Sequence, residues 1–167
     1  MKKKIMKGIA CMCVVGGAYF AGTLKKMTTN KNQEKNDKAI HHRLNTYYDI
    51  MTLWMQHIQE DRYIGEYLYD HGFHSIAIYG RGKIGILLYQ ELRNSKVKVK
   101  CFVDEVTREE FKGIDDIPNI VIKDISKQDV DAVVVTPCFD MKNITKVLLN
   151  AGCNTKIVSL YDVLFEM

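Results

Sequence analysis

The chain has very little proline and lacks paired cysteine motifs, and both shortages are informative. Its two prolines, Pro118 and Pro137, fall at the edges of expected strands. Its cysteines include no C-x-x-C pair, which argues against a structural zinc site. Their odd number fits buried, reduced thiols in a cytosolic setting. The five cysteines are Cys11, Cys13, Cys101, Cys138 and Cys153.

Recognisable catalytic motifs are missing as well. The pattern G-x-x-x-x-G-K-[ST] is absent, which disfavours ATP hydrolysis. No nucleophile-and-base set and no carboxylate pair is positioned by the sequence, and the histidines lack metal-ligand spacing. Tyr79 and Lys83 match Tyr-x-x-x-Lys, but they lie in a glycine loop rather than on a later helix, so we treat the match as chance. We therefore predict no catalytic and no metal-binding residues, and we favour a binding module over an enzyme.

Positive charge is scarce outside the N-terminal region. Residues 1–40 contain nine lysines and two acidic residues, Glu34 and Asp37, so their net charge is +7. Residues 41–167 contain 15 basic and 18 acidic side chains, so their net charge is −3, and the two parts add to +4. A general nucleic-acid binder needs Lys and Arg on its folded surface, so nucleic acid is not an expected partner. The division suits an N-terminal arm at a membrane surface.

The N-terminal sequence MKKKIMKGIACMCVVGGAYFAGTLKK contains an uncharged run, residues 8–24, between two groups of lysines. As a helix, this run covers about 26 Å, the short end of a membrane span. The flanking lysines can reach the headgroups, and Gly16, Gly17 and Gly22 let two such helices approach closely. We predict an uncleaved single-pass anchor at residues 1–26 that meets the membrane through residues 8–24. A cleaved signal peptide is the alternative.

Both flanks of the apolar run are basic, so charge alone leaves the orientation open. The denser N-terminal lysines favour a body outside the cell. The five lysines of KKMTTNKNQEKNDK, the thiols and the location of cellular nucleotides favour a cytoplasmic body, which we choose. Residues 27–39 are polar and lack aromatic residues, so we predict a solvated linker followed by one domain at 40–167.

Two helices are predicted at the start of this domain, within residues 41–71. Residues 41–59 place large apolar residues three and four apart, and RYIGEYLYDHG predicts a shorter helix that ends near Gly72. The apolar stripe of the first helix either docks a partner or, as we favour, packs on its own domain. Its members are Leu44, Tyr47, Tyr48, Met51, Trp54, Met55 and Ile58.

Strands and helices then alternate. Strands are expected at 74–79, 97–104, 119–122 and 131–137 and in KIVSL, and helices in KIGILLYQELRNS, MKNITKVLLNAG and YDVLFEM. The run DAVVVTP has the β-branched composition of a buried parallel strand. The fold class predicted is α/β: a Rossmann-like parallel sheet of about five strands with helices on both faces, preceded by the membrane helix and one or two added helices.

The segment IAIYGRGKIGILLYQEL carries the sharpest functional signal. Its glycines form G-x-G-x-x-G directly after a strand and at the start of a helix, where a pyrophosphate binds in dinucleotide-binding folds. In this interpretation the first glycine permits the turn, the second admits the phosphate and the third lets helix and strand pack closely. The predicted loop consists of Gly80, Arg81, Gly82, Lys83, Ile84 and Gly85. The alternative is that the glycines serve packing alone.

Two positions outside the loop extend this prediction. Asp104 ends the next strand, where a carboxylate accepts hydrogen bonds from a ribose and disfavours NADP, so NAD or a nucleotide sugar is the expected ligand. Glu105 is an alternative for this role. Thr136 ends the fourth strand, beside the point where strand order should reverse, and is expected to line the pocket. Asp140 is expected to cap the following helix.

From about Leu44 onward the chain resembles small bacterial Rossmann-like proteins related to polysaccharide and nucleotide-sugar biosynthesis. The motifs that carry the resemblance are LWMQHIQEDRYIGEYLYDHGFHSIAIYGRGKIGILLYQEL, VKVKCFVDE, DAVVVTP and KIVSLYDVLFE. Similar modules form the cofactor half of nucleoside-diphosphate-sugar epimerases and the nucleotide-sugar-binding lobe of certain sugar acetyltransferases. The resemblance implies phosphate contacts at Gly80, Gly82 and Gly85 and a ribose near Asp104. It implies no enzyme activity, because the catalytic parts of those relatives have no counterpart here.

Three hypotheses follow. The first is a membrane-anchored accessory protein that binds NAD or a nucleotide sugar, beside a membrane-bound glycan-assembly enzyme. The second is an epimerase-like or reductase-like enzyme completed by a partner or by a homodimer. The third is a structural interaction module whose glycine loop is empty.

Overall fold

The computed structural model describes residues 33–105 and 115–167. Contacts divide the chain into two units, Met1–Leu44 and Asn45–Met167. In the first unit, residues 33–44 are helical and exposed, and Lys38 pairs with Glu34 at 2.6 Å. Residues 33–39 of the predicted linker thus form an exposed helix. This stretch contains neither glycine nor proline, and the ion pair spans one helical turn.

The predicted membrane span, residues 8–24, lies outside the described residues, as do residues 27–32 of the predicted linker. Within the described ranges, none of the helices combines the length and the apolar composition that crossing a bilayer requires. Residues 45–59 continue the helix into the second unit, as predicted from their periodicity.

The second unit is built on five parallel strands. They lie in the order β3-β2-β1-β4-β5, which is the first part of the Rossmann strand order. Tyr79 at the end of β1 pairs with Val103 of β2 and Val135 of β4, so the strand ends lie at one edge. The five predicted strands are confirmed, as β1 (Ser75–Tyr79), β2 (Lys98–Asp104), β3 (Asn119–Val121), β4 (Ala132–Val135) and β5 (Lys156–Ser159).

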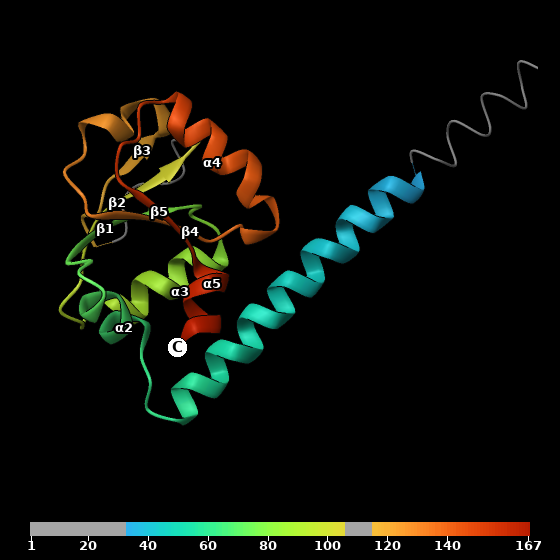
Figure 1. The fold of residues 1–167 in the computed structure, drawn as a ribbon, viewed down its shortest axis with the longest axis horizontal. Helices are drawn as coiled ribbons and strands as arrows, with labels where there is room; N and C mark the ends of the chain where they lie inside the picture. The colour runs from blue at the N-terminus through green and yellow to red at the C-terminus, as the bar shows by residue number, and fades with distance from the viewer. Residues whose placement is uncertain (1–32, 106–114) are drawn as a thin grey trace, which may run out of the picture. The chain divides into compact units, whose positions relative to one another are not determined.

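Helices cover both faces of this sheet, as predicted (Figure 1). Alternate residues of β1 enter two cores: Ile76 and Ile78 face α2, α3 and α5, whereas Ala77 and Tyr79 face α4 and a 3₁₀ helix. The helices are α2 (Ile64–Asp70), α3 (Lys83–Leu92), α4 (Met141–Asn150) and α5 (Leu160–Glu166), with 3₁₀ helices η1 (Ile122–Lys127) and η2 (Cys138–Asp140).

Helix 45–59 packs on the body through one side only. Ile50 and Trp54 are buried, and the His57 Nε2 atom lies 2.7 Å from the carbonyl oxygen of Leu164 in α5. The prediction that the whole apolar stripe packs on the domain is therefore partly wrong. The residues that face the body, Ile50, Trp54 and His57, form a different row with spacings of four and three residues. Five members of the predicted stripe are exposed instead: Leu44, Tyr48, Met51, Met55 and Ile58.

Candidate functional site

The candidate site lies at the carboxyl ends of β1 and β4. From β1 the chain proceeds to β2 and β3 on one side, whereas β4 and β5 lie on the other. The loops that leave β1 and β4 therefore diverge and leave a crevice, which is where open parallel sheets bind their ligands. The sequence predicted this position for Thr136, and the strand order confirms it.

Two glycines of the loop are required by the fold itself. Gly80 has φ of 93°, a conformation that side chains disfavour, and its N–H donates to the carbonyl oxygen of Val103 at 2.9 Å. A Cβ atom at Gly85 would overlap the carbonyl oxygen of Gly80, so α3 could not pack this closely on β1. These contacts give the turning and packing roles predicted for the first and third glycines.

Gly82 differs from both. It has extended backbone with φ of −77° at the N-cap of α3, and a Cβ atom there would meet nothing within 4 Å. No side chain caps the first turn of α3. The N–H groups of that turn and the positive end of the helix dipole therefore remain available to an anion. Close packing therefore does not require a glycine at position 82. A ligand that approaches the backbone at this point would require one.

A pocket of about 430 Å³ opens beside the loop. We call it the switch-point crevice. Seven residues line it: Tyr47, Gly80, Gly82, Lys83, Ile84, Thr136 and Pro137. Five of these were predicted site residues, so the structure brings the loop and Thr136 together as expected.

Tyr47 was missed as a site residue. It comes from helix 45–59, and its ring meets the Phe139 ring edge to face, with 5.6 Å between centroids. Its sequence signal was only the apolar periodicity of the helix, which does not distinguish a pocket wall from a core residue.

Thr136 holds the loop in place. Its buried hydroxyl lies 3.0 Å from the carbonyl oxygen of Tyr79 and 3.1 Å from that of Gly80, and donates its proton to this pair of acceptors. The strand that ends at Val135 thus fixes the turn that follows β1. Thr136 lines the crevice while its polar group is already engaged by backbone.

Asp104 and Arg81 are placed apart from the crevice lining. The Arg81 backbone N–H donates to the Asp104 carboxylate at 3.2 Å, and the Arg81 guanidinium carbon lies 5.9 Å from the centroid of the Phe102 ring. Of the two predicted cationic contacts, Lys83 therefore lines the crevice and Arg81 does not. Asp104 supports the turn from the β2 side.

The phenol of Tyr79 sits beside the same acidic strand end. Burial, and then the negative charges of Glu105 and Asp104, raise the pKa of Tyr79 to about 12. The phenol therefore keeps its proton at neutral pH, and Tyr79 cannot act as a base there. Asp140 precedes α4 as expected, but its carboxylate accepts from the Asn143 side chain at 2.6 Å rather than from the helix backbone.

Among the described residues, no group of three or more His, Cys, Asp or Glu side chains is arranged to hold a metal ion. Cys101, Cys138 and Cys153 are free thiols, and burial raises the pKa of Cys101 to about 11, which keeps it in the unreactive thiol form.

The chain is similar to a curated enzyme and to a solved structure. The chain is 34% identical over 99 residues to the UDP-N-acetylmuramoylalanine–D-glutamate ligase of Rickettsia bellii, a match that covers 58% of this chain and 21% of that enzyme. The structure of D-2-hydroxyisocaproate dehydrogenase aligns with 59% of this chain and 29% of that one, at 18% identity and a TM-score of 0.30. The chain thus spans about a fifth of the ligase and less than a third of the dehydrogenase.

The match to a protein family covers the sheet and the candidate site. The matched segment begins before β1 and ends within β5, so it contains the glycine loop, Asp104 and Thr136. Because the model of the family described as C2185-like, N-terminal, matches residues 73–158, more than half of the 167 residues, the chain belongs to this family.

Proposed function

We propose that the chain binds a nucleotide, as NAD or a nucleotide sugar, in the switch-point crevice and serves as a membrane-held accessory protein without chemistry of its own. The observation that carries this proposal is Gly82. Its neighbours Gly80 and Gly85 are explained by backbone conformation and packing, whereas Gly82 opens onto empty space at an uncapped helix N-terminus. Such a place suits a phosphate.

The crevice has the size of a small-molecule site. At about 430 Å³ it lies within the roughly 300–1,000 Å³ typical of such pockets. We favour a nucleotide sugar because the name of the curated relative places a UDP-linked sugar among its substrates. Asp104 supports the loop through its Oδ2 atom, which accepts from the Arg81 N–H, and we propose that its carboxylate also faces the ribose.

The test is the thermal stability of the full-length chain with UDP-sugars, NAD, NADH and NADP. A ligand at 100 times its dissociation constant should stabilise the fold by about 2.7 kcal/mol, a shift of several degrees. Gly82→Asp should abolish the shift, because its carboxylate fills the open space with negative charge. Asn94→Asp adds the same charge just beyond the other end of α3 and should leave the shift intact. No shift with any ligand, or equal loss in both variants, would overturn the proposal.

Membrane attachment through residues 8–24 and a cytoplasmic body complete the proposal. The free thiols among the described cysteines suit a reducing compartment. In fractionated cells the full-length chain should stay with membranes after alkaline extraction, and a variant lacking residues 1–26 should not. Protease added to intact cells should leave the body uncut. Release of the full-length chain by alkali would contradict the anchor, and cutting from outside would contradict the orientation.

A further inference from the structure

The outer side of helix 45–59 carries a regular apolar row. Tyr48, Met51, Met55 and Ile58 follow one another at spacings of three, four and three residues, and they are 72%, 38%, 54% and 43% exposed. This is the spacing of a helix-packing seam. The row is separate from the inward side of the helix, where Ile50 and Trp54 are buried.

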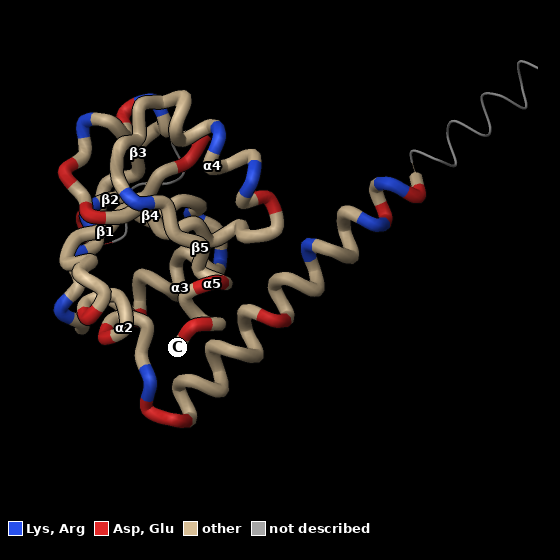
Figure 2. The backbone as a smooth tube through the Cα atoms, in the orientation of Figure 1, with Lys and Arg blue, Asp and Glu red and all other residues tan. Residues whose placement is uncertain are grey.

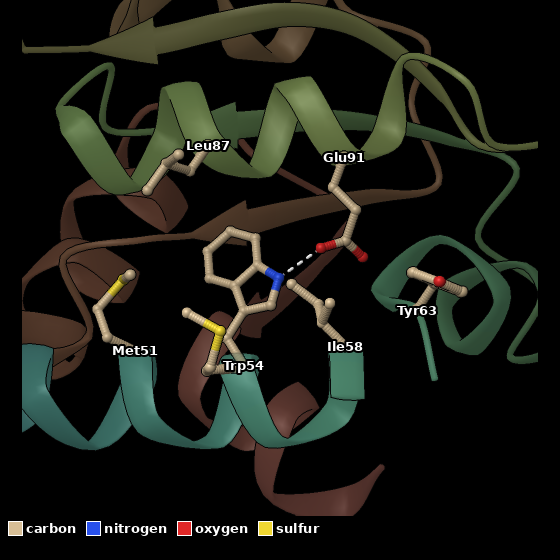
Figure 3. A pocket seen from close by; sticks show the side chains of 7 residues that line it. Met51, Trp54, Ile58, Tyr63, Leu87 and Glu91 are labelled. Carbon is tan, nitrogen blue, oxygen red and sulfur yellow. Dashed lines mark hydrogen bonds between the residues drawn. The ribbon is translucent and has the colours of Figure 1, made fainter. Parts of the chain in front are cut away.

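A groove runs between this row and α3 (Figure 3). We call it the Trp54 groove. It has a volume of about 290 Å³, and the Trp54 indole lies between the two helices with Leu87 of α3 above it. A second hollow of about 340 Å³ continues along the outer side of helix 45–59 past Tyr48. The remaining walls of the Trp54 groove are Met51, Met55, Ile58, Tyr63 and Glu91.

Glu91 is the one charged side chain in this lining. Its carboxylate accepts hydrogen bonds from the Trp54 Nε1–H and from the Ile64 N–H, the latter at 2.7 Å. Burial raises the pKa of Glu91, because the charged form is partly withdrawn from water. Within the described ranges no Lys or Arg side chain lies within ion-pair distance of it. A half-buried carboxylate in an apolar groove would gain from a cation supplied by a ligand.

The end of the groove beside Tyr63 is acidic. The charges of Asp61, Glu66 and Glu91 all raise the pKa of the Tyr63 phenol, with Asp61 the largest cause. The turn that follows helix 45–59 carries acidic positions at this point of the chain (Figure 2). Arg62 lies in the same turn, but it donates to Glu60 and to the carbonyl oxygen of Met167. An incoming ligand therefore meets an apolar floor and negative charge at one end.

We propose that the Trp54 groove is a docking site for a basic amphipathic helix of a partner protein. Aliphatic side chains of that helix would enter the groove beside Trp54, and a Lys or Arg one turn further would reach Glu91. Grooves of this kind recognise helices through anchors three and four residues apart, and Met51 and Met55 can adapt to their shape.

The test measures the fluorescence anisotropy of dye-labelled helical peptides titrated with the full-length chain in phosphatidylcholine nanodiscs. Three peptides share their leucines. Their polar faces carry Lys, Gln or Glu. The Lys peptide should show a saturating rise in anisotropy and bind about tenfold more tightly than the Glu peptide, as one favourable charge contact predicts.

Variants distinguish binding at this docking site from nonspecific binding to exposed apolar residues. Met55→Ser, which removes an apolar wall without adding charge, should weaken binding of the Lys peptide about tenfold or more. Leu149→Ser, at an equally exposed apolar position on α4, should have no effect. Glu91→Gln should reduce the preference for Lys over Gln peptides and keep the Gln peptide bound. Equal affinity for Lys and Glu peptides, or equal effects of Met55→Ser and Leu149→Ser, would overturn the proposal.

The other occupants give distinct results. Self-association of the chain without peptide, lost in Met55→Ser and kept in Leu149→Ser, would identify a second copy and overturn the partner helix. Displacement of the bound Lys peptide by added lipid alone would identify a lipid chain and overturn it as well. No rise in anisotropy with any peptide would show that the groove does not dock a helix of this chemistry.

Discussion

The switch-point crevice depends on backbone conformation more than the Trp54 groove, whose walls are all side chains. Three of the crevice's seven lining residues are glycine or proline, and its geometry depends on where α3 begins. The groove is lined by Met, Trp, Ile, Leu and Tyr, and its shape depends on how helix 45–59 lies against α3. Most of the crevice lies within the family match at residues 73–158, and most of the groove lies before it. The crevice thus lies mainly in the segment that carries the family match, and the groove lies mainly on helix 45–59, which precedes it.

The largest expected effect tests the backbone origin of the crevice. Gly85→Ala places a methyl group on the Gly80 carbonyl oxygen, so we expect a loss of about 3 kcal/mol in the free energy of unfolding. Gly82→Ala meets open space and should change it by less than about 0.5 kcal/mol. Urea denaturation of the full-length chain measures both. Similar small losses in the two variants would mean that α3 does not pack tightly on β1.

Substitutions at Glu91 test whether its two hydrogen bonds stabilise the walls of the groove. Glu91→Ala leaves the Trp54 Nε1–H and the Ile64 N–H without their acceptor, at a cost of about 2 kcal/mol. Glu91→Gln keeps an oxygen acceptor and should cost less. Denaturation followed through Trp54 emission reports both variants. If alanine and glutamine cost the same, the two hydrogen bonds do not hold helix 45–59 and α2 against α3.

Thr136→Val tests the side chain that links the crevice to β4. Valine keeps the shape but removes the hydroxyl that bonds the Tyr79 and Gly80 carbonyl oxygens, so we expect a loss of about 1 kcal/mol. Amide hydrogen exchange should show faster exchange at Gly80 than in the parent chain. Unchanged protection at Gly80 would show that the turn holds without the hydroxyl. Thr136→Ser, which keeps the donor, is the matched control.

The smallest effect lies at the opposite edge of the sheet. The Asp131 carboxylate accepts from the Ser75 N–H at 2.7 Å, the Ser75 hydroxyl and the His74 N–H, and the bond to the Ser75 backbone is the main cause that lowers its pKa below 3.8. Because the folded-state pKa is the lower one, this stabilisation is present above the unfolded value and is lost as pH falls through the folded pKa.

Asp131→Asn should therefore cost about 0.5 kcal/mol at neutral pH, since the group is exposed, and the difference from the parent chain should shrink in acid. Denaturation at a series of pH values measures this difference. If the difference in unfolding free energy between the variant and the parent chain stays constant at acidic pH, the charge of Asp131 does not contribute to stability.

Much of the fold could be predicted from local sequence. The β-branched run DAVVVTP, the strand-to-helix glycines and the helix stops before Gly72 and Gly152 all act over short distances, so their elements were predicted to within a residue or two. The position of Thr136 beside the glycine loop agrees with the expected reversal of strand order next to the fourth strand, which the observed order places beside β1.

The assignment of helix 45–59 was less complete for a physical reason. Tyr47, Trp54 and the exposed Met55 all satisfy the same helical periodicity, and periodicity does not say which side meets the sheet. The same limit hid the bond between Asp104 and the Arg81 backbone, because a strand-end carboxylate has the same sequence signal whether it meets a ribose or a turn.

The sequence by itself determined the five parallel strands, the helix-start glycines and their position at the strand ends, because each depends on neighbours within a few residues or on chain connectivity. Only the tertiary structure decided that Tyr47 lines the crevice, that Gly82 is the glycine which packing does not require, and that Trp54 and Glu91 enclose a separate groove. Those outcomes depend on contacts between segments far apart in the chain, where burial and backbone overlap act across space and leave no local pattern in the sequence.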